Sequence, residues 1–427
     1  MISKEIIKDI ITENGEYISS DVGPIIPRQG IIVPGPGTRK AKILYGTRRC
    51  GKTFILYDVY RKNKGRALYV DFEDERLSDA DITDLQRIKE SFFELKPGLL
   101  PAKNVTFCFD EIQNIKGWEK FVRRLVEREN INIWVAGSSS KITPHYIHSS
   151  LRGREWSIPV YPFSFQEYLK VNKINLADSV YGKKKTIALG CLDAYLKFGG
   201  YPEITLTPDD FTRKKILDEY MKAMIFKDLI EHYRIKNITL FDTLQESLFS
   251  SFADKFSPTS FRKQFRGKFP FSKTSLFKYY NHFISRLLVY ELRIFTNSVY
   301  KRRRNPAKIY LADMGLARKT ADDRFGRSLE NLVFLDLRRS GYDGYYYEGV
   351  GQCDFVGYDK TKQFFALQVT WEITKDNQER EYRGLIEACR KFHLKSGFIV
   401  TRDQEYAFSE GSTTINVIPY AKWLLNI

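Results

Sequence analysis

The sequence of 427 residues contains only five cysteines and five histidines, and it has no long apolar run. The cysteines lie far apart, without a Cys-x-x-Cys pair or a nearby group of histidines, which argues against a disulfide framework and a zinc site. Free thiols favour a reducing compartment, so a cytoplasmic location is predicted. No segment reaches the roughly 20 uncharged apolar residues of a membrane helix, and charges interrupt the isoleucines at the start, unlike a signal peptide. We expect a soluble protein with no membrane partner.

Apolar residues and positive charge are abundant. Hydrophobic residues make up 43% and aromatic residues 15% of the sequence, which excludes a disordered chain, and the length predicts about two to four domains. The formal net charge is +17. Residues 240–319 contain 16 Lys or Arg and 5 Asp or Glu, so this segment carries 11 of the 17 excess positive charges. Such a concentration indicates a face for a polyanionic partner.

Short apolar strands alternate with helices in the first part of the chain, after a short helix and a Gly/Pro-rich lead-in. This alternation is typical of a parallel sheet covered on both faces, which places the protein in the α/β class. The strands are expected at residues 42–45, 67–72, 105–109 and 131–136, and the helices at 53–62, 84–95 and 118–128.

One glycine-containing turn follows the first predicted strand and opens a helix. It fits the pattern GxxxxGK[ST], in which backbone N–H groups cradle phosphates, the lysine reaches the β/γ oxygens and the hydroxyl ligates Mg²⁺. The pattern therefore predicts a site for ATP and Mg²⁺. Its residues are Gly46, Thr47, Arg48, Arg49, Cys50, Gly51, Lys52 and Thr53.

The strand at residues 105–109 is followed by two carboxylates, Asp110 and Glu111. A carboxylate at this strand end holds Mg²⁺, and its neighbour polarises the attacking water. The alternative is that the two acids cap the next helix. With the upstream loop present, we assign Asp110 to the metal and Glu111 to catalysis.

Two further residues are candidates for catalysis. Ser138 follows the strand at 131–136, where a hydroxyl can contact the γ-phosphate, although a polar turn is the alternative. Arg154 can supply positive charge to the γ-phosphate of its own ATP or of a neighbouring subunit's ATP. A surface ion pair is the competing interpretation for Arg154.

These motifs resemble a large family of archaeal and bacterial AAA-type P-loop ATPases that carry an uncharacterised C-terminal nuclease-like domain. The resemblance implies an ATPase core, a helical lid, a winged-helix region and a restriction-endonuclease-like PD-(D/E)XK domain, but no settled biological role. Besides the loop at residues 46–53, the matching segments are Tyr69–Leu77, Asp110–Gln113, Gly137–Ser140, Leu151–Arg154, Gly199–Pro202 and Tyr310–Leu316.

We accordingly divide the chain into five parts. They are a lead-in at 1–40, the P-loop core at 41–165, a helical lid at 166–235, a basic winged-helix-like domain at 236–320 and a nuclease-like domain at 321–427. In the fourth part, helices precede two strands, Val289–Phe295 and Lys308–Leu311, and the basic turn Lys301–Arg304 is expected at the position of a wing.

Nucleases of the implied kind use a helical Glu, an acid at a strand end, and Glu-x-Lys or Gln-x-Lys on the next strand. Here the lysine position holds threonine and the second acid is a glutamine, so a vestigial site is favoured over an active nuclease. Glu372 or Lys391 offers partial replacement. The corresponding residues are Glu330, Asp354, Gln368 and Thr370.

Cations and aromatics alternate in the basic middle of the chain. This pattern favours non-specific, salt-sensitive contacts to duplex DNA, with a solvated surface or an acidic protein partner as alternatives. The candidate DNA contacts are Arg262, Lys263, Arg266, Lys268, Lys273, Arg302, Arg303 and Arg304.

The sequence leaves three functions open. The first is an ATP-hydrolysing, DNA-associated protein, the second an ATP-dependent DNA nuclease, and the third a nucleotide switch that acts on a protein partner. It also leaves open whether the chain forms a homo-oligomer.

Overall fold

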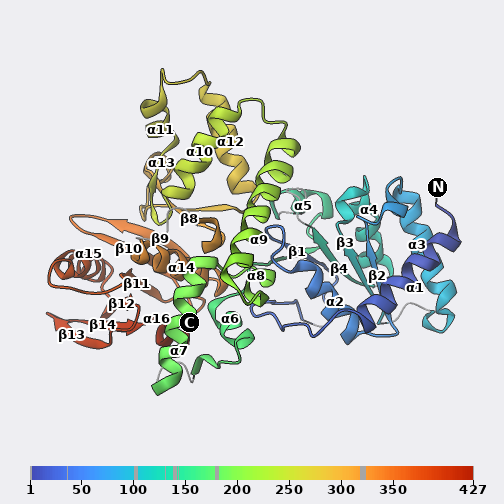
Figure 1. Cartoon of the computed structure of the whole chain (residues 1–427), viewed down its shortest axis with the longest axis horizontal. Coiled ribbons are helices and arrows are strands. Elements are labelled where there is room, and N and C mark those ends of the chain that lie inside the picture. The colour runs from blue at the N-terminus through green and yellow to red at the C-terminus, as the bar shows by residue number, and fades with distance from the viewer. Residues whose placement is uncertain are drawn as a thin grey trace. The chain divides into compact units, whose positions relative to one another are not determined.

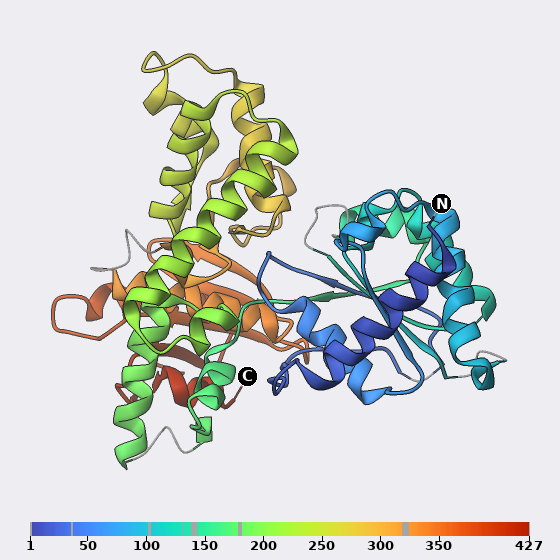
Figure 2. The same ribbon diagram turned by 45° about the vertical axis from the view of Figure 1, so that its right-hand side comes forward.

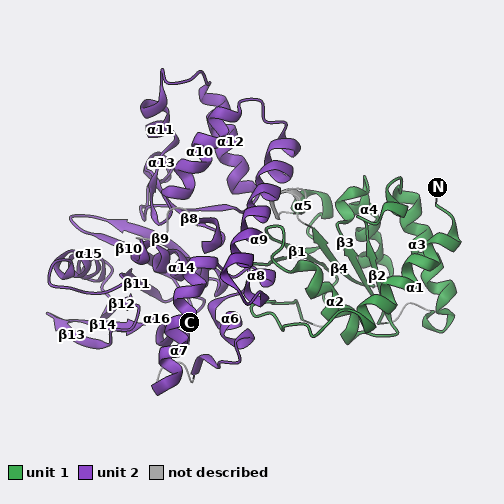
Figure 3. Ribbon diagram, in the orientation of Figure 1, with its two compact units in different colours: residues 1–161 green, residues 162–427 purple. Residues whose placement is uncertain are grey.

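The computed structural model describes residues 2–35, 37–100, 104–129, 131–137, 142, 144–177, 182–317 and 324–426. The chain divides into two compact units, residues 1–161 and residues 162–427 (Figure 3). Each unit is described by itself.

The first unit is built on a five-stranded parallel sheet with the strand order β2-β3-β4-β1-β5 (Figure 1). The register places Tyr45 opposite Gly137 and Asp71 opposite Asp110, so four strands end at one edge. The strands are β1 Ala41–Tyr45, β2 Ala67–Asp71, β3 Thr106–Asp110, β4 Asn132–Gly137 and β5 Glu155–Pro159, and the helices are α1 Lys4–Ser20, α2 Lys52–Lys62, α3 Ile82–Leu95, α4 Trp118–Arg124 and α5 Pro144–Leu151.

Successive strand residues point to opposite faces of the sheet. Both faces carry buried apolar residues, and helices cover both. Phe107 and Phe109 of β3 lie in one core cluster with residues of α3 and α4. Cys108, between them, lies in a second cluster with residues of α2. The mixed α/β fold with a parallel sheet, expected from the sequence, is confirmed.

The N-terminal helix α1 belongs to this unit. Its N-cap Ser3 accepts a hydrogen bond from the Ile6 N–H, and Ile7 and Ile10 are buried in the core cluster that contains α3. The helix lies against β2, the edge strand (Figure 2). The predicted lead-in therefore contributes to the core of the first unit.

The second unit begins with helices. Asp313 accepts hydrogen bonds from the Gly200 and Gly315 N–H groups, both at 2.8 Å. A Cβ at Gly199, whose φ is +80°, would lie 1.7 Å from Asp313 Oδ1. The motifs at 199–202 and 310–316 thus meet in one buried turn, which requires glycine. The helices are α6 Phe165–Val171, α7 Gly182–Phe198, α8 Pro202–Leu206 and α9 Asp210–Ala223, which continues as the π-helix Met224–Glu231.

A small antiparallel sheet with the order β6-β8-β7 lies in the middle of this unit, with α12 packed against β7. The predicted basic turn at residues 301–304 is wrong, because these residues form the helix α13, whose N-cap Ser298 accepts a hydrogen bond from the Lys301 N–H. The elements are α10 Ile238–Ser250, β6 Asp254–Phe256, α11 Pro258–Phe265, α12 Lys273–Ser285, β7 Val289–Leu292, α13 Val299–Arg304 and β8 Ala307–Leu311.

The last part of the second unit is a six-stranded mixed sheet with the order β13-β14-β12-β11-β10-β9. Helix α15 covers one face through a core that includes Leu385 and Cys389. The sequence pattern predicts helix, strand, strand, helix, strand here, so three of the six strands and the final helix were not expected. The elements are α14 Phe325–Arg339, β9 Asp343–Glu348, β10 Gln352–Tyr358, β11 Phe364–Val369, α15 Gln378–Lys391, β12 Ser396–Thr401, β13 Tyr406–Glu410, β14 Thr413–Pro419 and α16 Tyr420–Leu424.

All five cysteines are free thiols, as expected from their spacing. In the described part of the chain, none of the helices has both the length and the apolar character that crossing a membrane requires.

Candidate functional site

The loop between β1 and α2 is tightly curled at the edge where β1, β2, β3 and β4 end. A Cβ on Gly46 would lie 2.1 Å from the Val160 carbonyl oxygen, so only glycine fits there. Arg49 and Gly51 have φ values of 66° and 97°, in the left-handed region. These dihedrals bend the loop so that α2 begins at Lys52.

The polar atoms of the loop suit a phosphate ligand. Lys52 is only 6% exposed, and its ammonium donates to the carbonyl oxygens of Thr47 at 2.8 Å and Gly46 at 3.2 Å. The buried Thr47 hydroxyl has no hydrogen-bond partner among the described residues. A buried lysine held by neutral carbonyls and an orphan hydroxyl, beside the N-terminus of α2, fit a triphosphate.

Asp110, the last residue of β3, meets the first turn of α2. Its Oδ2 accepts hydrogen bonds from the Thr53 hydroxyl at 2.6 Å and from the Tyr69 hydroxyl at 3.3 Å. Burial, together with the charges of Glu111 and Asp71, raises the pKa of Asp110 to about 7. The Asp110 carboxylate and the Thr53 hydroxyl provide oxygen donors of the kind that Mg²⁺ prefers. These two residues would therefore hold the ion.

Glu111 lies beside Asp110 at the same edge. Its backbone is in the left-handed region with φ 49°, and its N–H donates to the Ala136 carbonyl of β4 at 2.9 Å. The Gln113 amide donates to the Glu111 carboxylate. Glu111 therefore lies where the sequence analysis expected it, and Gln113 holds its side chain.

Of the two other candidate catalytic residues, the structure describes Arg154. Ser138 lies outside the described residues. Arg154 directly precedes β5, whose first residue pairs with Ala41 at the start of β1, roughly 15 Å along the strand from the loop. Its Nε donates to Glu127 at 3.0 Å. The structure thus does not place Arg154 at its own chain's loop, and a role at a neighbouring subunit stays a prediction.

Arg28 of the lead-in fixes the loop from outside. Its guanidinium donates to the Cys50 carbonyl at 2.8 Å and to the Tyr161 carbonyl at 2.6 Å. One side chain therefore connects the phosphate loop to the end of the first unit.

The second unit contains a separate buried cluster of charge. Glu330 of α14 and Asp354 of β10 lie together, as predicted, but the cation beside them is Lys308 of β8. The Lys308 ammonium donates to Asp354 Oδ1 at 2.7 Å and to Glu330 Oε1 at 2.9 Å. Burial lowers the pKa of Lys308, but the charges of Asp354 and Glu330 outweigh this effect and raise it above the usual value.

The other predicted members of this site play structural parts. Gln368 Oε1 accepts from the Asp354 N–H at 3.1 Å, and its amide donates to Glu381 at 2.7 Å. The Thr370 hydroxyl donates to the Glu372 carbonyl at 3.3 Å. Glu372 lies beyond the end of β11 and is exposed, and Lys391 contacts aromatic rings. Glu372 therefore does not replace the missing acid, and Lys391 does not replace the missing lysine.

The basic residues expected to contact DNA are exposed, with one exception. Arg302 is half-buried; it donates to the Thr296 carbonyl at 2.6 Å and lies over the Tyr345 ring, so the structure uses it internally. Phe261, Phe265 and Phe269 contact one another or neighbouring rings rather than standing free. The exposed members are Arg262, Lys263, Arg266, Lys268, Lys273, Arg303 and Arg304.

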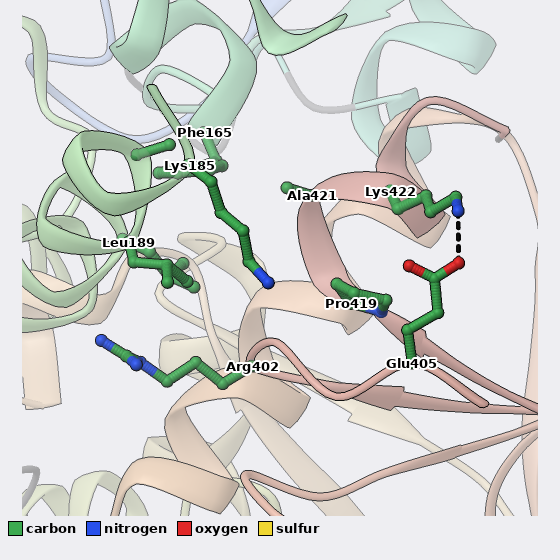
Figure 4. A pocket seen from close by; sticks show the side chains of 10 residues that line it. Phe165, Lys185, Leu189, Arg402, Glu405, Pro419, Ala421 and Lys422 are labelled. Atoms are coloured by element: carbon green, nitrogen blue, oxygen red, sulfur yellow. Dashed lines mark hydrogen bonds and ion pairs between the residues drawn. The ribbon is translucent and has the colours of Figure 1, made fainter. Parts of the chain in front are cut away.

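A small pocket lies between α6, α7 and the segments around α16 (Figure 4). Lys422 and Glu405 form an ion pair at its rim. Its volume of about 30 Å³ has room for one or two waters only, so it is not a ligand site.

Three contact residues carried no assigned role in the sequence analysis: Tyr69, Gln113 and Lys308. Tyr69 and Gln113 lie inside the segments 69–77 and 110–113. A polar side chain close to an acid in the sequence is the signal that could have identified them. Lys308 lies 22 and 46 residues from its two partners. No spacing within the C-terminal segment points to it.

Residues 38–169 match the family described as an AAA domain, and residues 191–324 match a domain of unknown function (DUF8612). The uncharacterized protein MJ1544 of Methanocaldococcus jannaschii is 32% identical, over 100% of this chain and 96% of that protein. An uncharacterized protein of Haemophilus influenzae is 25% identical, over 90% of this chain and 94% of its own. Among solved structures, the Walker-type ATPase PABY2304 of Pyrococcus abyssi is similar over 74% of this chain and 95% of that chain, with 15% identity and a TM-score of 0.43.

The curled loop, the strand-end carboxylates and the match over residues 38–169 together define an AAA-type P-loop ATPase domain in the first unit. The whole chain belongs to the family of MJ1544.

Proposed function

We propose that this protein binds ATP with Mg²⁺ and hydrolyses it. The observation that carries the proposal is the 2.6 Å contact between Thr53 and Asp110, with Lys52 beside it in the same loop and helix turn. Phosphate binding needs the loop N–H groups and Lys52, and metal binding needs a hydroxyl and a carboxylate. These groups meet at one sheet edge.

Each residue has a distinct part in this reaction. Lys52 exchanges its bonds to the loop carbonyls for bonds to the β and γ oxygens, which places the γ-phosphate at the end of β3. Glu111 accepts a hydrogen bond from the attacking water and orients it in line with the bond that breaks. Bound Mg²⁺ supplies positive charge to the phosphate oxygens.

Replacing Lys52 tests the proposal. Lys52→Ala should lower the hydrolysis rate at least about 100-fold, because a preorganised cation that stabilises transition-state charge is lost. Lys62→Ala, on the exposed end of the same helix, is the matched control and should keep parental activity. Hydrolysis by Lys52→Ala at the parental rate would show that the loop is not the catalytic site.

We further propose that residues 238–311 form a winged helix that binds duplex DNA without sequence preference. The order helix, strand, helix, helix, strand, helix, strand, in which α13 separates the last two strands, and the sheet order β6-β8-β7 support this proposal. The exposed cations on α11 and in the turn that follows it provide phosphate contacts.

A salt titration tests this second proposal. Arg262→Ala/Lys263→Ala/Arg266→Ala should weaken binding and reduce the slope of log affinity against log salt by roughly 0.9 for each phosphate that the variant no longer neutralises. The control Lys183→Ala/Lys184→Ala/Lys222→Ala removes equal charge from α7 and α9 and should leave the slope unchanged. If the parental chain shows no affinity for DNA at low salt, the alternative of a nucleotide switch acting on a protein partner gains support.

For residues 325–426 we propose a nuclease-like fold that does not cut. The order helix, three strands, helix, strand and the placement of Glu330 and Asp354 support the likeness. Both acids contact Lys308, and this contact argues against an ATP-dependent nuclease.

A further inference from the structure

A large cavity opens beside the cluster of Lys308, Glu330 and Asp354 in the second unit. Its volume is about 690 Å³, which lies within the range of ligand-binding sites. Its lining includes residues of α14, β10, β11 and α15, with Lys308 from β8. A divalent metal is what a nuclease-like fold would place here, so the fit of the residues to a metal decides what the cavity is.

Three of the four carboxylate oxygens of the two acids accept hydrogen bonds. Asp354 Oδ1 accepts from Lys308 and Asp354 Oδ2 from the Val369 N–H at 3.0 Å. Glu330 Oε1 accepts from Lys308 and from the Tyr310 hydroxyl at 2.7 Å. Mg²⁺ needs a nearly octahedral set of oxygen ligands, and most of the carboxylate oxygen positions here are taken.

No other acid completes the set. Gln368, which stands at the position of the second strand carboxylate, has its oxygen bound to the Asp354 N–H. Among the described residues, no group of three or more His, Cys, Asp or Glu side chains could hold a metal ion. The residues of the cavity do not fit a divalent cation.

The charges on the cavity wall are paired in the same manner. An anionic ligand would have to break these pairs to be held by the arginines. The pairs are Arg327 with Asp254, Arg380 with Glu381 and Arg383 with Glu379.

We propose that Lys308 is a built-in counter-ion that takes the place of the divalent metal, so that this cavity holds no metal while Lys308 is present. The ammonium lies within hydrogen-bond distance of both carboxylates, and its side chain is 2% exposed. Burial, followed by the charge of Asp354, raises the pKa of Glu330, which favours its protonated form. The inference depends on neither ATP binding nor DNA binding.

The source of this cation gives the arrangement a second consequence. Lys308 lies on β8, the central strand of the small antiparallel sheet, whereas its partners lie on α14 and on β10 of the six-stranded sheet. The replacement therefore comes from outside the nuclease-like segment, and it joins that segment to the basic domain.

Titration with Mn²⁺ tests the proposal. Calorimetry uses the full chain without nucleotide and carrying Asp110→Asn, so that the loop in the first unit lacks its metal carboxylate. This parent and its Asp354→Asn derivative should bind Mn²⁺ equally, because the cavity binds none. Loss of a Mn²⁺ site in the derivative would overturn the proposal.

Removal of the lysine should create a metal site. In the same parent, Lys308→Met should bind one more Mn²⁺ per chain, with an affinity at least tenfold higher than that of any residual Mn²⁺ binding by the parent. Adding Asp354→Asn should abolish this additional site. Circular dichroism checks that Lys308→Met folds. A folded Lys308→Met chain that binds no additional Mn²⁺ would show that Lys308 is not what excludes the metal. The Asp354→Asn comparison decides the question even if Lys308→Met does not fold.

Discussion

Each unit of the molecule contains a buried lysine near a carboxylate, and the hydrogen bonds of the two lysines differ. In the first unit, Lys52 donates to neutral carbonyls of its own loop, and a hydroxyl from Thr53 contacts Asp110. In the second unit, Lys308 donates directly to Glu330 and Asp354. Both clusters contain a lysine and acidic residues, but only the second lysine donates hydrogen bonds to the acids.

The difference teaches which cluster requires a partner. At the first sheet edge, burial together with the charge of Glu111 raises the pKa values of Asp71 and Asp110, and the Lys52 ammonium is bonded to loop carbonyls. A bound Mg²⁺ can offset the charge of these carboxylates, and Lys52 can offset that of the phosphates. In the second unit the Lys308 ammonium contacts both carboxylates directly, so a cation is already in place there. The position of a cation therefore informs function more than its presence.

The largest expected effect concerns the charge on Asp110. The folded pKa of about 7 lies above the ordinary value of 3.8, so the contribution of this group to stability is present below about pH 4 and is lost as pH rises through 7. Asp110→Asn should therefore raise the free energy of unfolding, without nucleotide or Mg²⁺, by on the order of 3 to 4 kcal/mol at pH 8.

Urea unfolding at pH 4.5 and pH 8 measures the effect of Asp110→Asn, which should shrink strongly at the lower pH. Asp58→Asn, on α2 and paired with Lys62, is the control with little expected change. Equal effects at both pH values would mean that ionisation of Asp110 does not lower the stability of the folded chain.

The next effect is on catalysis. Glu111→Gln should lower the hydrolysis rate about 100-fold and leave ATP binding nearly unchanged, because the amide keeps the shape but cannot take a proton from water. Single-turnover hydrolysis and equilibrium nucleotide binding measure the two quantities separately. Glu90→Gln on α3 is the control, and a Glu111→Gln rate within twofold of the parent would assign the water to another residue.

The smallest effect tests the second cluster. Tyr310→Phe removes a 2.7 Å hydrogen bond to buried Glu330, which should cost about 1 to 3 kcal/mol of stability without changing ATP hydrolysis. Urea unfolding gives the value. Tyr300→Phe, whose ring is exposed, should cost less than about 0.5 kcal/mol. Parental stability in Tyr310→Phe would mean that this hydroxyl does not support the cluster.

Much of the first unit could be predicted from the sequence because its signals are local. The loop follows a strand and opens a helix within eight residues, Gly46–Thr53. The acids of β3 stand at a strand end, and parallel pairing brings such ends to one edge. The role of Gln113 was less visible, because it depends on the left-handed backbone at Glu111.

The second unit was harder to predict because its contacts are distant in sequence. Lys308 reaches Asp354 across 46 residues, and no period or motif encodes that distance. Strand β13 is largely exposed at the sheet edge, so it lacks the apolar alternation that marks a strand. The run of basic residues at 301–304 predicts a turn, because the serine cap at 298 is a weak helix signal among charged residues.

The two hydrogen bonds of Arg28 have a mechanical consequence. One guanidinium holds the carbonyl of Cys50, inside the loop, and that of Tyr161, the last residue before the chain passes into the second unit. Planar guanidinium donors tolerate little change in direction. A displacement of the Cys50 carbonyl must therefore either break one of these hydrogen bonds or shift the peptide at Tyr161. That peptide is covalently linked to the first residue of the second unit.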